Sequence, residues 1–116
     1  MPRLQPQDPA AVAEAIARAE RSKADLRLLT KHFLARLAQQ APGRSVEVRV
    51  PPYAAAQVVE GVRHTRGTPP AVIELDATTW IALATGETSW HAAVEEGRVR
   101  ASGERADLSP YLPIQP

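Results

Sequence analysis

The sequence contains no cysteine, so it forms no disulfide bonds and offers no thiolate to a metal ion. It also lacks any apolar run near the roughly 20 residues that a membrane-spanning helix needs. The N-terminus has no apolar signal core. We therefore expect a cytoplasmic protein without a transmembrane segment.

Neither positive nor negative charge predominates, and aromatic side chains are few. The 14 Lys and Arg residues are scattered among 13 Asp and Glu residues, which gives a net charge of +1. This balance predicts no nucleic-acid partner. With one Phe, two Trp and two Tyr, the core is expected to be aliphatic. A chain of 116 residues suits one domain, which we place at residues 8–116 after a flexible tail at residues 1–7.

Two helices are predicted in the first third of the chain. Asp8-Pro9 is a favourable helix start, because the acid can cap the helix and Pro suits the first helical position. Val12, Ile16 and Ala19 form only a narrow apolar stripe, so this helix should dock weakly. Ser22 can cap a second helix with a wide apolar face, formed by Leu26, Leu29, Phe33 and Leu37.

Alternation of apolar and polar residues then predicts strands. Residues 45–50 alternate Val with Glu and Arg, and Pro51-Pro52 indicates a bend or a sheet edge. In the next strand, Ala54, Ala56 and Val58 share one face. Their small side chains leave room for a helix or for a ligand to pack closely.

Residues 73–108 read as a strand, two short helices and a final strand. Asp76 and Ser89 (or Thr88) can cap the helices, and Gly86 and Gly97 can end them in the left-handed conformation. Arg98–Ser102 alternates as a strand. Together these patterns predict an α+β fold, with a mixed, mostly antiparallel sheet of four or five strands covered by helices on one face.

The glycine and apolar positions of this region resemble the sterol-carrier-protein-2 (SCP-2) family. The similar residues are Leu83-Ala84-Thr85-Gly86, Ala92-Ala93 and Gly97-Arg98-Val99 up to Gly103. Arg63 to Pro70, and the terminal Asp107-Leu108 and Tyr111-Leu112-Pro113, resemble a bacterial SCP-2-like branch. Eukaryotic members carry a longer C-terminal segment that helps to close a ligand tunnel, so we expect a more open cavity here.

The resemblance implies an SCP-2-like fold and a non-enzymatic carrier of a lipid, sterol or acyl chain. With the small-residue strand, it predicts an apolar cavity between sheet and helices, bordered by Ala56, Val58, Trp80, Leu83 and Trp90. The alternative is a protein-interaction or regulatory module on the same fold without a ligand cavity. An open tunnel favours this alternative, because it would expose apolar surface that a protein partner could cover.

Polar chemistry is sparse. His64, Arg66 and Thr68 could bind an anionic head group of the ligand, because Gly67 lets backbone N–H groups approach it; the alternative is an ordinary solvated loop. The histidines lack metal-ligand spacing, and no nucleophile–base pair is visible, so we expect no metal, no cofactor and no enzymatic activity. His32 lies off the Leu29 face and is expected at the surface.

Overall fold

The computed structural model describes residues 3–61, 70–103 and 106–116. In these residues the strands β1 (Val46–Val50), β2 (Ala54–Val58), β3 (Ala71–Leu75) and β4 (Val99–Ser102) form one sheet in the order β2-β1-β3-β4. Strand β1 pairs antiparallel with β2 and parallel with β3, and β3 pairs antiparallel with β4. The predicted mixed, mostly antiparallel sheet is confirmed, with four strands.

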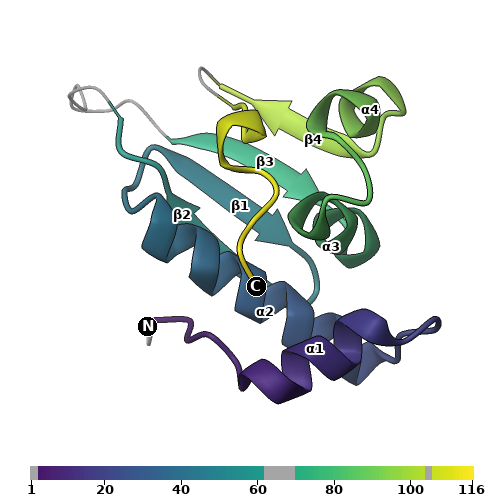
Figure 1. The fold of residues 1–116 in the computed structure, drawn as a ribbon. Coiled ribbons are helices and arrows are strands. Elements are labelled where there is room, and N and C mark those ends of the chain that lie inside the picture. Colours follow the sequence, from purple (N-terminus) through teal and green to yellow (C-terminus); the bar gives the residue numbers. More distant parts are fainter. Residues whose placement is uncertain (1–2, 62–69, 104–105) are drawn as a thin grey trace.

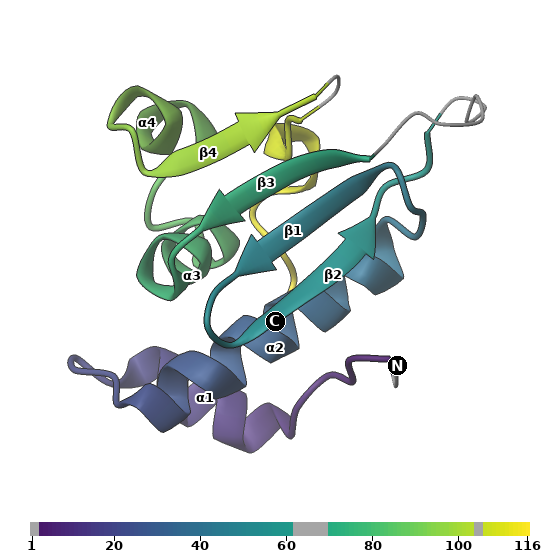
Figure 2. The same cartoon turned by 180° about the vertical axis from the view of Figure 1, so that it is seen from behind.

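The helices are α1 (Pro9–Ala17), α2 (Lys23–Gln40), α3 (Ala77–Thr85) and α4 (Trp90–Glu95), and a short 3₁₀ helix, η1, spans Ser109–Tyr111. Helices α2 and α3 and the C-terminal segment lie over one face of the sheet (Figure 1). Seen from behind, the described part of the sheet shows its other face without a covering helix (Figure 2). The prediction of helices on one face is therefore confirmed.

Alternation along the strands explains this asymmetry. Val46, Val48 and Val50 of β1 are fully buried on the covered face, against the apolar side of α2. The uncovered face carries charge: Glu74 is the register partner of Arg49 in β1 and of Arg100 in β4. Opposite charges at neighbouring cross-strand positions are favourable, so this face is suited to water.

The predicted helix boundaries are set by the expected residues. Asp8 accepts from the backbone N–H of Ala11, and Asp76 accepts from that of Thr79 at 2.7 Å. Ser22 and Asp25 form a reciprocal capping box at the start of α2, which satisfies two backbone donors. Ser89, not Thr88, caps α4.

The glycine predictions are confirmed too. Gly86 ends α3 with φ of 83°, and Gly97 follows α4 with φ of 73°. Both values lie in the left-handed region, which residues with a Cβ adopt only at a cost.

The C-terminal segment runs back across the helices. Its Leu108 and Ile114 are buried. The backbone N–H of Ile114 donates to the carbonyl oxygen of Ala84 at 2.9 Å, and Arg36 Nε of α2 donates to that of Gln115 at 3.2 Å. The segment thereby connects α3 with α2 and comes close to α1 (Figure 1).

Candidate functional site

Three of the predicted cavity residues lie in the packed core. Val58, Trp80 and Leu83 are almost completely buried, and Trp80 Nε1–H donates to the carbonyl oxygen of Thr30 at 3.3 Å. Ala56 and Trp90 are half-buried against the same core. The predicted ligand site between sheet and helices stays a prediction. His64, Arg66 and Thr68 lie outside the residues that the structure describes.

A different apolar hollow lies beside α1, and we call it the α1 cleft. Its volume is about 330 Å³, and it is lined by Pro9, Val12, Ala13, Ile16, Ala17, His32 and Pro116. The five α1 residues follow the spacing i, i+3, i+4, i+7 and i+8, so they form one face of the helix. Packing on α2 buries Val12, while Pro9, Ala13 and Ala17 stay exposed. The narrow stripe predicted from the sequence is therefore only partly covered.

A second cleft adjoins the first and shares Ile16 and Pro116 with it. It has a volume of about 320 Å³ and is also lined by Phe33, Thr85, Pro113, Ile114 and Gln115. Each volume falls at the lower end of the range of roughly 300–1,000 Å³ typical of small-molecule pockets. Helix α1 and the C-terminal segment thus provide two adjoining apolar hollows.

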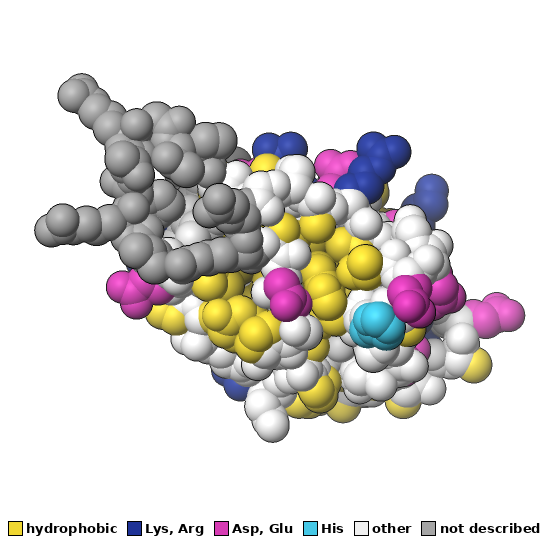
Figure 3. All heavy atoms as spheres, turned by 90° about the horizontal axis from the view of Figure 1, so that it is seen from above, with side chains coloured by type: hydrophobic (Ala, Val, Ile, Leu, Met, Phe, Trp, Pro, Cys, Tyr) yellow, Lys and Arg dark blue, Asp and Glu magenta, His cyan; other side chains and the backbone are white. Residues whose placement is uncertain are grey.

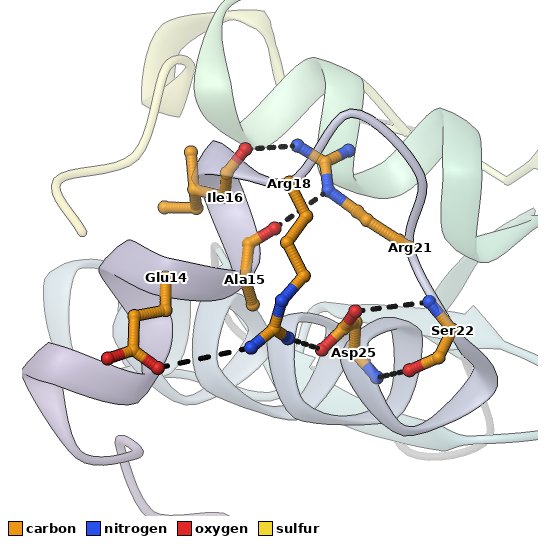
Figure 4. Close-up of polar contacts among 7 residues, drawn as sticks. All are labelled: Glu14, Ala15, Ile16, Arg18, Arg21, Ser22 and Asp25. Carbon is orange, nitrogen blue, oxygen red and sulfur yellow. Dashed lines mark hydrogen bonds and ion pairs between the residues drawn. The ribbon is translucent and has the colours of Figure 1, made fainter.

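Two arginines hold the C-terminal end of α1 (Figure 4). Arg21 donates from Nε to the carbonyl oxygen of Ala15 at 3.2 Å, and from Nη2 to that of Ile16 at 3.0 Å. Arg18 pairs with Asp25 of α2. Cations are favourable at a helix C-terminus, where carbonyl groups lack helical partners. We call these contacts of Arg18 and Arg21 the arginine clamp.

Asp25 takes part in both the clamp and the cap of α2. Its carboxylate accepts from the backbone N–H of Ser22 at 3.1 Å. This hydrogen bond, together with the Arg18 guanidinium, lowers the pKa of Asp25 below its ordinary value, against the opposing effect of burial. The carboxylate is therefore charged at neutral pH, as the ion pair requires.

His32 corrects the expectation from the sequence, because it is only 4% exposed. The side of α2 that bears His32 faces α1 and the residues before it. The Nδ1 atom accepts from the backbone N–H of Gln7 at 3.0 Å, and the ring meets Phe33 edge-on at a centroid distance of 5.2 Å. Burial lowers the pKa of His32, and the charge of Arg36 lowers it further. The ring is therefore neutral at physiological pH.

The hydrogen bond from Gln7 also fixes the tautomer of His32. A neutral imidazole has one donor and one acceptor nitrogen. Since Nδ1 accepts, the proton lies on Nε2. That Nε2 atom is buried and has no hydrogen-bond partner within the described residues. The burial of this histidine could have been predicted from the apolar stripe of α1. That stripe needs an apolar surface to pack on, and α1 therefore covers the side of α2 that bears His32.

Polar groups elsewhere in the described residues form no metal site. His91 pairs with Glu95 at 3.1 Å, but both side chains are mostly exposed. In residues 3–61, 70–103 and 106–116, no three His, Asp or Glu residues converge as metal ligands. No helix in this part of the chain has the length and hydropathy to cross a membrane.

A further apolar surface lies at the β4 end of the molecule, where hydrophobic side chains gather (Figure 3). This end includes α4 and β4. Val94 of α4 is 45% exposed, and Trp90 and Val99 are half-buried. Strand β4 is at the edge of the sheet, so one row of its backbone groups is unpaired with another described strand.

Comparison with known proteins identifies the family. The family described as "Bacterial SCP ortholog" matches residues 21–114, which begin after α1. No curated protein matches the chain significantly. Among solved structures, sterol carrier protein-2 like-3 of Aedes aegypti is 24% identical, with a TM-score of 0.40, over 76% of this chain and 92% of that one. The predicted membership is confirmed by the family match: the chain belongs to the bacterial SCP ortholog family.

Proposed function

We propose that this protein is a non-enzymatic carrier or binding protein for an apolar small molecule, and that the molecule binds in the α1 cleft. The observation that carries this proposal is an apolar hollow of about 330 Å³ on a domain of the bacterial SCP ortholog family. Six of its seven lining residues have aliphatic or proline side chains. Such a lining favours a hydrocarbon body, because its main contribution is burial of apolar surface.

The expected affinity follows from that burial. Micromolar binding corresponds to about 8 kcal/mol. Burial of roughly 300 Å² of apolar surface at about 25 cal/mol/Å² contributes a similar amount before the costs of ordering. A single alkyl chain of moderate length is therefore a suitable ligand, and the adjoining cleft at Ile114 gives a longer chain room to continue.

The cavity predicted between sheet and helices is the competing location. There the ligand would contact Val58, Trp80 and Leu83, with a head group near Arg66. Because Trp80 is fully buried, binding there requires the core to open. The α1 cleft requires a smaller change, since α1 is already only partly covered on its apolar face.

The first experiment looks for binding and for its location. Native mass spectrometry of protein purified from a bacterial host should show a co-purified lipid-sized mass. A dansyl-labelled fatty alcohol, which carries no carboxylate, should then bind with micromolar affinity by fluorescence. Ala13→Trp places an indole in the α1 cleft and should abolish this binding. Ala10→Trp is the matched control, because Ala10 is exposed on the same helix and does not line the cleft.

The outcomes separate the two locations. If Ala13→Trp blocks the probe and Ala10→Trp does not, the ligand binds in the α1 cleft. Unchanged binding by both variants, with energy transfer from the tryptophans to the dansyl group, favours the predicted core cavity. If neither a co-purified ligand nor binding of the probe is found, the carrier proposal is wrong.

The second candidate function is a protein-interaction module, and the exposed Val94 with the half-buried Trp90 and Val99 favours it. A protein partner could bury this surface and pair with the edge of β4. In that case Val94→Glu would abolish partner binding while leaving the affinity for the dansyl probe unchanged.

A further inference from the structure

One residue that lines the apolar α1 cleft, His32, also carries a buried polar atom without a partner among the described residues. Of the residues that line the cleft, only His32 has a polar side chain. The Nδ1 atom of the ring accepts a hydrogen bond from the backbone N–H of Gln7. The other ring nitrogen, Nε2, therefore carries the proton and can only donate. Within the described residues this donor is buried without an acceptor. A buried donor without a partner loses its hydration and gains nothing in return.

The charge of the surroundings restricts which acceptor is suitable. The one ionisable side chain of the lining, His32, is neutral, and Arg36, whose charge also lowers the pKa of His32, does not line the cleft. A carboxylate or phosphate placed here would lose its hydration without a cation among the lining side chains, which is far more costly than for a neutral oxygen. The site therefore discriminates by charge as well as by hydrogen bonding.

From this geometry we infer that the ligand is an aliphatic molecule with one uncharged oxygen, such as an alcohol, ester or ketone, which accepts a hydrogen bond from His32 Nε2–H. This inference rests on the proposed carrier function. It adds the class of the ligand and the side chain that recognises it. In the sequence, the α1 residues that line the cleft precede residues 21–114, which match the family, whereas His32 lies within that range.

Access to the donor requires a local rearrangement. Nε2 is buried, so a ligand must displace the side chains that cover it. The arginine clamp holds the C-terminal end of α1, through the carbonyl groups of Ala15 and Ile16. The covering side chains must therefore move while the hydrogen bond from Gln7 to His32, which fixes the tautomer, stays in place.

Titrations with decanol and decane test the hydrogen bond. Both probes have the same alkyl body, but only decanol has an acceptor. His32→Phe removes the donor and keeps an aromatic ring. It should weaken decanol by about tenfold, the effect of one hydrogen bond, and leave decane unchanged or slightly tighter. An equal loss for both probes, or no loss for decanol, would overturn the inference.

Decanoic acid tests the preference for a neutral head. Its carboxyl group is ionised above about pH 5, so the neutral form decreases tenfold with each further pH unit. If only the neutral acid binds, the apparent affinity should fall in the same proportion between about pH 7 and 9. An affinity independent of pH in this range would show that the site accepts a carboxylate, which contradicts the inference.

A measurement on the wild-type protein does not depend on the folding of a variant. With ¹⁵N-labelled histidine, the Nε2–H signal of His32 should shift downfield with decanol and stay in place with decane. A decanol complex in which this signal does not move overturns the inference and leaves the carrier function intact. If none of the three probes binds, both the proposed function and this inference fail.

Discussion

Arg21 offers a direct way to loosen α1 without altering the surface of the cleft. Its guanidinium donates to the carbonyl oxygens of Ala15 and Ile16 and lies 3.7 Å from a carboxylate oxygen of Glu87. Arg21→Met keeps the apolar stem and removes these contacts. Water can then solvate the released carbonyl groups, so the net cost should be about 1–2 kcal/mol for the two hydrogen bonds together. That corresponds to a roughly 5- to 30-fold larger population with α1 detached.

Hydrogen exchange is the appropriate assay, because it reports local opening residue by residue. Exchange of the Val12 and Ala15 amides should accelerate by that factor, while the amides of β1 and β3 keep their protection. Arg27→Met is the control, since Arg27 is exposed on α2. Unchanged exchange in α1, or an equal acceleration in α1 and the sheet, would refute the role of the clamp as a separate anchor.

Three further predictions concern stability. Leu29 is fully buried on α2, so Leu29→Ala should lower the free energy of unfolding by about 2–5 kcal/mol; a urea titration with a loss below about 0.5 kcal/mol would contradict its place in the core. Gly86→Ala and Gly97→Ala should each cost about 1 kcal/mol through the positive φ. At Gly97 a Cβ would meet no atom within 4 Å, so thermal melts of that variant isolate the backbone effect, and an unchanged midpoint would exclude it. The lowered pKa of His32 means that the unfolded chain binds a proton more readily than the folded one. The contribution of His32 to the free energy of unfolding should therefore be fully present above about pH 6.5 and decrease as the pH falls below that value toward the folded-state pKa. His32→Phe should remove this pH dependence. A pH dependence that persists in the variant would assign it to other groups.

The sequence predicted the parts of the fold that depend on neighbouring residues. Asp8, Ser22 and Asp76 cap helices because their side chains reach backbone donors three residues away. Gly86 and Gly97 end helices because the backbone itself requires a positive φ there. The family resemblance drew on such positions, and the match to residues 21–114 confirms it.

The prediction that was wrong, and the features that the sequence did not predict, depend on contacts between distant segments. His32 lies off the Leu29 stripe, and periodicity alone places it in water. It is buried because α1 and Gln7 cover that side of α2. The path of the C-terminal segment over α3, fixed by Ile114 on Ala84, also has no local signal. Both features build the clefts, so the α1 cleft could not be located from the sequence.

The most direct test of the central claim is to map decanol binding by chemical-shift changes in a ¹H–¹⁵N spectrum of the wild-type protein. If decanol binds in the α1 cleft, the largest chemical-shift changes should cluster at Val12, Ala13, Ile16 and Ala17 and at the side chain of His32. Changes centred on Val58, Trp80 and Leu83, with α1 unaffected, would contradict it and place the ligand between the sheet and the helices.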